Sequence, residues 1–260
     1  MSYQTLVNLE KYSLEHQPGA SIEKARNDLH HHGLAVLPDF LTAAALETTL
    51  QHCKPLENEA YHNTLIGNAY LEPVDETLPE DHARRITDST SLGVIAYDQF
   101  SKDHPLLELY HAPEFKNFIE LCIDRGPLCY YDCPLGKVNL AVMAEYEKLR
   151  WHFDQSDFVV SIPLQHADEG GEYQYVYQIR SADEENYDAV KRLLQGDHSN
   201  AKVLNVAPGS LVLFEGRYTI HRVTEVKGST TRLVALFGFD ISPGKSSTPY
   251  LRKIRYGREG

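Results

Sequence analysis

Hydrophobic and polar positions in three segments of the N-terminal half follow the pattern of helices. Ser21 and Thr42 stand where they would cap the first two helices, and Pro113 stands near the first turn of the third. The predicted helices are residues 21–32, 43–53 and 113–123. Residues 56–100 are polar, and we expect them to be irregular.

From about residue 137 the pattern changes to short segments of β-branched and aromatic residues, bounded by turns such as Asp168-Glu-Gly-Gly171. A polar stretch, 183–195, interrupts them and is expected to be helical. The predicted strands are 33–38, 137–146, 158–164, 171–179, 203–206, 210–214, 220–226 and 231–239. Strands behind a helical N-terminal third predict a mainly β sandwich or barrel with a helical buttress, and among these we favour a jelly roll with N-terminal helices.

The chain of 260 residues contains no internal repeat and no Pro/Gly/Ser-rich linker, so residues 1–260 are predicted to form one domain. Within it, about 1–130 would be the helical N-terminal part with substrate-covering segments. About 131–240 would be the jelly-roll core, and 241–260 a C-terminal tail whose Tyr250 and Tyr256 could close over a pocket.

Composition excludes several classes of protein. A net charge of −12 argues against sequence-independent nucleic-acid binding, because phosphates would be repelled. No stretch approaches the roughly 20 apolar residues of a membrane helix, and no secretory signal is visible, so we expect a soluble cytoplasmic protein. Cys129 and Cys133 have a spacing that a metal could use, but no second Cys/His pair completes a site, and we expect all four cysteines to be reduced thiols.

The sharpest chemical feature is Trp151-His152-Phe153-Asp154. On an extended segment, residues two apart point to the same face, so His152 and Asp154 would project together. A distant predicted strand begins near His221, which offers a second imidazole. Two histidines and one carboxylate on one face form the facial triad of non-heme Fe(II) oxygenases.

Arg232 stands 11 residues after His221 among apolar neighbours. Alternation with Val234 and Leu236 turns its guanidinium inward, and a buried arginine needs an anionic partner. The simple alternative is a salt bridge to one of the 37 acidic residues. The more specific hypothesis is that its partner is the distal carboxylate of a bound dicarboxylic acid, which a guanidinium fork matches.

The order His152-x-Asp154, His221, Arg232 resembles that of the Fe(II)/2-oxoglutarate-dependent oxygenases. The segment 151–165 (WHFDQSDFVVSIPLQ) is similar to the subgroup of free-amino-acid radical halogenases and their sister hydroxylases. The resemblance covers 137–240 well and 30–55 loosely. It implies a double-stranded β-helix that holds Fe(II) with the two histidines and Asp154. It also implies 2-oxoglutarate on the metal with Arg232 at its C5 carboxylate, and O₂ as the oxidant.

The resemblance also bears on the reaction. Halogenases of this subgroup carry Gly or Ala in place of the carboxylate ligand, whereas this chain has Asp154, so hydroxylation is expected rather than halogenation. The predicted function is hydroxylation of an unactivated C–H in a small polar substrate, a free amino acid, by a monomer or homodimer. Desaturation or cyclisation of another small metabolite, a non-catalytic jelly-roll binding module and a cupin-type metal-dependent isomerase remain alternatives.

Further candidates come from residues near the motif. Arg84 or Arg85 could clamp a substrate carboxylate, although a solvated charged turn is the alternative. Tyr146 could hydrogen-bond 2-oxoglutarate or substrate, and Gln155 could line the pocket. The remaining histidines are expected to face solvent or helix ends, His104 among them.

Overall fold

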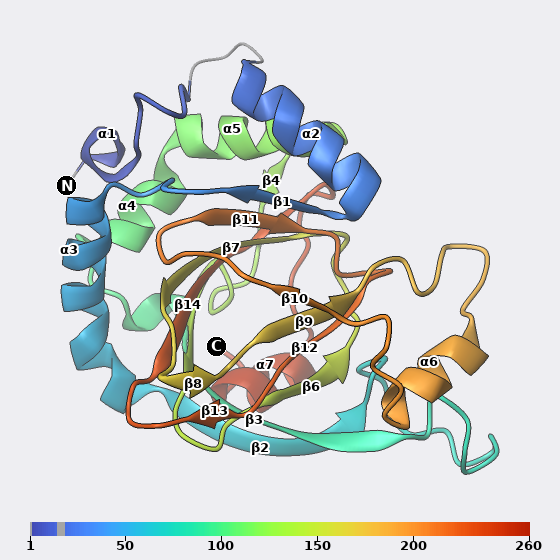
Figure 1. Ribbon diagram of the computed structural model, residues 1–260. Helices are drawn as coiled ribbons and strands as arrows, with labels where there is room; N and C mark the ends of the chain where they lie inside the picture. Colours follow the sequence, from blue (N-terminus) through green and yellow to red (C-terminus); the bar gives the residue numbers. More distant parts are fainter. Residues whose placement is uncertain (1, 15–18) are drawn as a thin grey trace.

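The computed structural model describes residues 2–14 and 19–260 and contains two antiparallel sheets that face each other, as in a jelly roll (Figure 1). The larger sheet has seven strands. In spatial order they are β1 (Leu34–Leu37), β11 (Leu211–Phe214), β7 (Val159–Gln165), β14 (Arg232–Phe237), β5 (Val138–Met143), β3 (Thr87–Ile95) and β2 (Tyr61–Asn68). The predicted mainly β jelly roll is therefore confirmed.

The smaller sheet has four strands, which supply most of the candidate metal ligands. In spatial order they are β10 (Lys202–Leu204), β9 (Tyr173–Val176), β12 (Ile220–Val223) and β6 (Leu149–His152). Two short ribbons complete the strands: β13 (Val226–Lys227) with β8 (Glu169–Gly170), and β15 (Phe239–Asp240) with β4 (Cys129–Tyr130).

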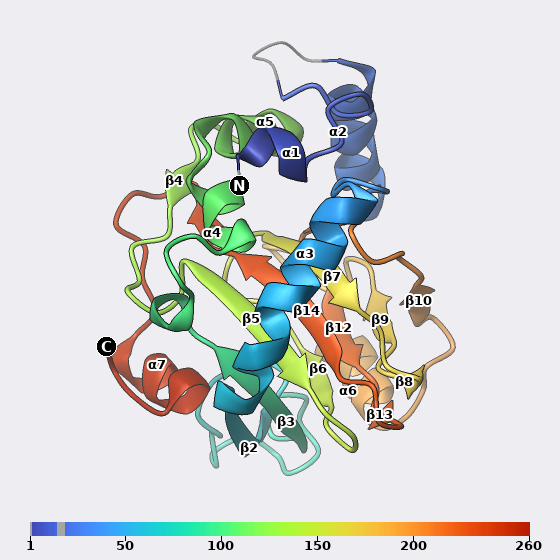
Figure 2. The ribbon, with the colours of Figure 1, turned by 90° about the vertical axis from the view of Figure 1, so that its left-hand side faces the viewer.

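Helices from the N-terminal half cover the outer face of the seven-stranded sheet (Figure 2). They are α1 (Tyr3–Leu6), α2 (Ala20–His32), α3 (Ala43–Cys53), α4 (Pro105–His111) and α5 (Pro113–Ile123). In α5 the buried residues Phe115, Phe118, Ile119 and Cys122 recur at helical spacing and form one stripe toward the sheet. Burial of each large apolar side chain contributes about 1.5–3 kcal/mol, so this stripe fixes the helical layer on the sheet.

Strand alternation divides the large sheet into a helix-facing side and a cavity-facing side. In β14, Leu233 and Ala235 belong to the core under the helices, while Arg232, Val234 and Leu236 line the cavity between the sheets. The same alternation holds in β5 and β7. An arginine at the first position of β14 therefore points into the interior of the jelly roll.

Two remaining helices and two 3-10 turns lie outside this layer. The insertion predicted at 183–195 forms α6 (Tyr187–Leu194), and the C-terminal tail forms α7 (Pro249–Tyr256), which packs against β2 and β3. The 3-10 turns are Lys54–Glu59 and Tyr97–Gln99. None of the helices within 2–14 and 19–260 combines the length and the apolar character needed to cross a lipid bilayer.

Several local predictions are confirmed. The helices expected at 43–53 and 113–123 have those bounds, and the Thr42 hydroxyl accepts a hydrogen bond from the Ala45 amide as an N-cap. Gly33 ends α2 in the left-handed region, where a Cβ would also strike the Tyr177 ring at 2.4 Å. Any side chain at position 33 would therefore be strained.

Other predictions are wrong. The N-cap of α2 is Gly19 rather than Ser21. Residues 56–100 are not irregular, because they contain β2 and β3, two long strands that pair along their whole length and extend the large sheet. The large sheet thus takes β1, β2 and β3 from the part of the chain before residue 130. His104 does not face solvent but is buried, and its Nδ1 accepts a hydrogen bond from the Leu106 amide at the start of α4.

Candidate metal centre and cavity

The two histidines of the predicted triad lie on neighbouring strands of the smaller sheet. His152 is the last residue of β6, His221 lies in β12, and the two are direct cross-strand partners. Their ring centroids are 4.1 Å apart. Asp154 lies two residues beyond the end of β6, and this short spacing together with the cross-strand register brings all three side chains to one place.

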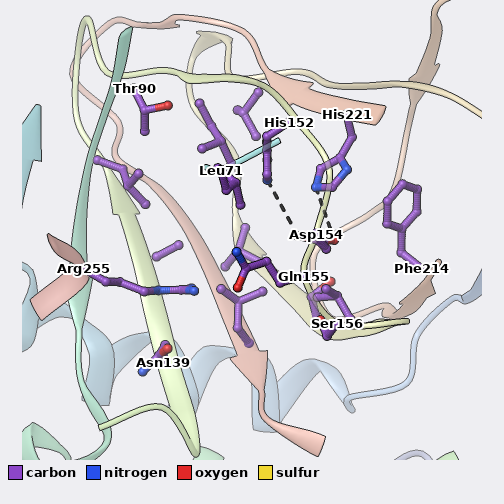
Figure 3. Close-up of a pocket in the computed structure, with 18 of the residues that line it drawn as sticks. Leu71, Thr90, Asn139, His152, Asp154, Gln155, Ser156, Phe214, His221 and Arg255 are labelled. Carbon is purple, nitrogen blue, oxygen red and sulfur yellow. Dashed lines mark ion pairs between the residues drawn. The ribbon is translucent and has the colours of Figure 1, made fainter. Parts of the chain in front are cut away.

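The ligand atoms of the three side chains face a common point (Figure 3). His152 Nε2 lies 3.7 Å from Asp154 Oδ1, and His221 Nε2 lies 3.5 Å from Asp154 Oδ2. The longer distance exceeds that of a hydrogen bond, and one ion can lie within coordination distance of all three atoms. Two imidazoles and a carboxylate on one face are the donor set of non-heme Fe(II) sites.

Backbone carbonyls orient both imidazoles for this role. His152 Nδ1 donates to the Arg150 carbonyl at 2.9 Å, and His221 Nδ1 donates to the Thr219 carbonyl at 3.0 Å. A proton on Nδ1 leaves the Nε2 lone pair free and aimed at the shared point. The neutral forms are favoured, because burial lowers the pKa of His152 to about 3 and that of His221 to about 4.

The Asp154 carboxylate has an oxygen without a hydrogen-bond donor among the described residues. Its Oδ2 is buried, and no residue in 2–14 or 19–260 gives it a hydrogen bond. Burial raises the pKa of Asp154, while the charges of His152 and Arg255 act in the opposite direction. A buried carboxylate oxygen without a donor is costly unless a cation compensates it, so a metal ion fits this position.

A glycine makes room for that carboxylate. The Asp154 amide donates to the Gly216 carbonyl at 3.0 Å, so the two backbones run in contact. A Cβ on Gly216 would lie 1.6 Å from Asp154 Oδ2. Sequence reasoning did not find Gly216, because a close approach between two loops leaves no pattern along the chain.

Arg232 lies in the same cavity, at the start of β14. It is only 9% exposed, its Nε has no hydrogen-bond partner, and its Nη1 lies 3.8 Å from Met143 Sδ. Burial lowers its pKa to about 10. Within the described chain no carboxylate pairs with Arg232, so the salt-bridge alternative has no support and the need for an anionic partner remains.

Tyr173 lies beside His221 and interacts electrostatically with Arg232. It was not predicted as a site residue. Its ring stacks on His221 with centroids 5.4 Å apart, and it lines the cavity from β9. Burial raises its pKa well above the usual value, so it is a neutral phenol. The alternation Tyr173-x-Tyr175 in a predicted strand was the available signal, since residues two apart share a face.

The cavity has a volume of about 1320 Å³ and extends from the triad between the sheets to α7. Gln155 lines it, as expected. Arg84 lines it too, but its Nη1 lies 3.6 Å from Glu72 and its guanidinium stacks on the Tyr70 ring. This volume suits a co-substrate and a small substrate together.

Two other predicted residues lie elsewhere. Tyr146 sits in a turn with φ +69°, is 70% exposed and is not part of the cavity wall, so its expected contact with co-substrate or substrate is wrong. Arg85 is also outside the wall, because its Nη1 donates to the Leu78 carbonyl at 2.8 Å. Both positions are set by local turns that sequence alternation does not describe. All four cysteines are free thiols, as expected.

Comparison with protein families matches residues 138–242, less than half of the chain, to the family described as carrier-protein-independent halogenase WelO5. Comparison with curated proteins finds no match. Many solved structures share the fold. One is HygX from Streptomyces hygroscopicus with nickel and 2-oxoglutarate bound, with 13% identity, coverage of 92% of this chain and 96% of HygX, and a TM-score of 0.60.

Two further structures show that the fold serves different reactions. A Pseudomonas putida prolyl-4-hydroxylase has 15% identity and a TM-score of 0.52 over 84% of this chain and 98% of its own. The α-ketoglutarate-dependent carbocyclase SnoK from nogalamycin biosynthesis has 14% identity and a TM-score of 0.56 over 88% and 86%. Together with the family match, they confirm the resemblance to the Fe(II)/2-oxoglutarate-dependent oxygenase superfamily. They do not select a reaction within it.

Proposed function

We propose that the protein is an Fe(II)- and 2-oxoglutarate-dependent hydroxylase that acts on an unactivated C–H of a small polar substrate, a free amino acid. The observation that carries the proposal is the convergence of His152, Asp154 and His221 in one cavity with the unpaired, buried Arg232. A cation site and an anion site of this kind match a metal chelated by a dicarboxylic keto acid.

Each of these residues has a separate task. His152, Asp154 and His221 would hold Fe(II) on one face and leave three positions open, and Arg232 would bind the C5 carboxylate of 2-oxoglutarate. When bound, Fe(II), 2-oxoglutarate and O₂ supply the oxidation, in which the keto acid becomes succinate and CO₂ and the substrate gains oxygen. The chain itself positions the substrate and excludes water from the site.

The cavity wall suits that task. Met143, Tyr173 and Phe214 surround the triad and Arg232 with apolar surface. The carbonyls of Arg150 and Thr219 keep the protons of the two imidazoles on Nδ1, away from the metal side. The apolar wall lowers the local dielectric constant. The electrostatic attraction between Arg232 and a bound carboxylate is therefore stronger than it would be in water.

Asp154 supports hydroxylation over halogenation, although the matched family is described as a halogenase. Halogenases of the subgroup that the sequence resembles lack this carboxylate, and a halide takes its coordination position. Here both Asp154 oxygens lie close to the histidine Nε2 atoms, so the carboxylate would fill that position. Hydroxyl rather than halogen transfer is therefore the proposed outcome.

The test is succinate release from 2-oxoglutarate, screened over the common free amino acids in buffer that contains chloride, with product analysis by mass spectrometry. We expect substrate-dependent succinate and a product that has gained one oxygen atom. A chlorinated product would contradict the hydroxylase proposal, and loss of two hydrogens would assign desaturation or ring closure instead. Substrate-independent succinate alone would contradict the choice of a free amino acid.

A further inference from the structure

Six arginines line the cavity, and four of them have oxygen partners in the protein: Arg84 with Glu72, Arg150 with Thr90, Arg180 with Glu185, and Arg217 with Asp157. The other two are Arg232 and Arg255. Throughout residues 2–14 and 19–260, neither guanidinium forms a hydrogen bond to oxygen or an ion pair. The cavity therefore offers its ligands two guanidinium groups that, among these residues, have no oxygen as a hydrogen-bond or ion-pair partner.

Arg255 belongs to α7, and the residues around it fix that helix in place. The Ile254 carbonyl accepts a hydrogen bond from Asn63 Nδ2 at 3.0 Å, which ties α7 to β2. The buried Tyr256 donates its hydroxyl proton to Asn139 Oδ1 at 2.9 Å. Arg258 forms two hydrogen bonds with the Asp98 carboxylate, at 2.8 and 2.6 Å. Residues on both sides of Arg255 are thus anchored, while its own side chain is not.

The unanchored side chain extends into the cavity. Figure 3 shows the Arg255 guanidinium directed toward Gln155, the residue after Asp154. In the part of the chain that the structure describes, the Gln155 side-chain amide also has no hydrogen-bond partner, since only its backbone carbonyl is used, by Arg217. A cation from α7 and an amide donor next to Asp154, both without partners among the described residues, therefore face each other in the cavity.

The two free arginines are separate sites. Arg232 is buried between the sheets beside Met143 and Tyr173, whereas Arg255 is exposed to the cavity at its α7 side. One 2-oxoglutarate molecule brings a single distal carboxylate, and Arg232 is the cation that lies within the walls of the jelly roll. Arg255 is therefore available to bind a second anionic group.

We propose that Arg255 binds the carboxylate of the substrate, with the Gln155 amide beside it, and thereby restricts the enzyme to substrates with a free carboxylate. This assignment rests on the proposed function, because it takes Arg232 as the site of 2-oxoglutarate. A guanidinium fork and a carboxylate form paired charge-assisted hydrogen bonds. An anchor on a fixed C-terminal helix would set which carbon of the substrate reaches the metal.

The test is anaerobic calorimetric binding to the Fe(II)- and 2-oxoglutarate-loaded protein, with the twenty common free amino acids and their C-terminal amides as probes. Without O₂ no turnover occurs, so binding is measured directly. We expect Arg255→Gln to weaken binding of the preferred free amino acid roughly 10- to 100-fold, the range of a charge-assisted contact. The amide should bind the wild type weakly and lose much less than the free amino acid in Arg255→Gln, because its neutral carbonyl can accept a hydrogen bond from the guanidinium but forms no ion pair with it.

Lys253→Gln is the matched control, since it removes the same charge from an exposed position of α7 outside the cavity wall. It should bind the free amino acid like the wild type. Equal binding of the free amino acid to the wild type and Arg255→Gln would overturn the assignment, as would a wild type that binds no free amino acid. An equal loss of amide binding would also overturn it, because the carboxylate would then not be the group recognised.

The same protein samples distinguish a failure of the Arg255 assignment from a failure of the proposed function. The visible charge-transfer band of the anaerobic Fe(II)–2-oxoglutarate complex should be unchanged in Arg255→Gln. Loss of the band only in that variant would mean that Arg255 binds the co-substrate, which overturns the substrate assignment and leaves an oxygenase. Absence of the band in the wild type would contradict the proposed function itself.

Discussion

His152 and His221 are opposite each other across β6 and β12, with ring centroids 4.1 Å apart. Because successive side chains of a strand point to opposite faces, a shift of one residue in this pairing would turn one imidazole out of the cavity. The metal centre therefore depends on the register of two short strands as much as on the identity of its ligands.

Replacement of Asp154 by Gly should abolish hydroxylation, because it removes the carboxylate that lies between the two imidazoles. The measurement is substrate-dependent succinate together with the oxygenated product. Asp197→Asn is the matched control, since the exposed Asp197 bonds to Ser199 outside the cavity wall, and it should keep activity. Wild-type turnover in Asp154→Gly would refute the ligand assignment.

Gly216→Ala should impair the metal centre without adding or removing any polar group. The new Cβ would lie 1.6 Å from Asp154 Oδ2, so the carboxylate or the loop must shift. We expect Fe(II) affinity to fall roughly 10- to 100-fold, as when groups that orient metal ligands are lost. Anaerobic Fe(II) titration measures this. Gly19→Ala, where a Cβ has open space, should leave the affinity unchanged, and unchanged affinity in Gly216→Ala as well would contradict the geometry.

Arg232→Met should make the ligand-free protein more stable while it removes 2-oxoglutarate binding. The wild-type guanidinium is buried without an anionic partner, and its replacement by an apolar side chain is expected to raise the free energy of unfolding by about 1–3 kcal/mol. Excess 2-oxoglutarate should stabilise the metal-loaded wild type, by about 2.7 kcal/mol at 100 times Kd, but not the variant. Urea unfolding measures both. A less stable ligand-free variant that still responds to 2-oxoglutarate would assign Arg232 a structural role.

His104 should make the folded protein less stable in mild acid. Burial lowers its pKa to about 4 from the usual 6.5, so below pH 6.5 the unfolded chain binds a proton that the folded chain does not. This contribution is lost as the pH falls from about 6.5 to 4 and amounts to about 2 kcal/mol between pH 7 and pH 5.

His104→Asn provides the measurement. Asn can still accept the Leu106 amide hydrogen bond at the start of α4, but it does not titrate. The difference in unfolding free energy between pH 7 and pH 5 should therefore shrink by about 2 kcal/mol relative to the wild type. An unchanged pH dependence would show that His104 is protonated as easily in the folded state as in the unfolded state.

The sequence predicted the parts of the fold that follow a period. Arg232, Val234 and Leu236 were placed on one face by alternation alone, and the structure puts all three on the cavity wall. The β2–β3 hairpin was missed because its strands are polar: in β2 only Asn68 is buried, so the strand carries no alternating apolar signal. An edge strand that exposes most of its residues looks like a loop in sequence.

The site was predictable where ligands are close in sequence and unpredictable where they meet through loops or helices that are distant in sequence. His152 and Asp154 lie two residues apart at the end of β6, so an extended chain brings them together. Arg84 and Arg85 were the candidate substrate cations, but Glu72 and the Tyr70 ring engage Arg84 and the Leu78 carbonyl engages Arg85. Arg255 comes 101 positions after Asp154, on a helix that only tertiary packing brings to the cavity, and no pattern in the tail distinguishes it from Lys253.

The most direct test of the metal centre is the visible spectrum of the protein with Fe(II) and 2-oxoglutarate in the absence of O₂. We expect a weak metal-to-ligand charge-transfer band in the wild type, and its loss in His221→Ala at the same concentrations. Folded wild-type protein that gives no such band would contradict the claim that His152, Asp154, His221 and Arg232 together hold iron and its keto-acid co-substrate.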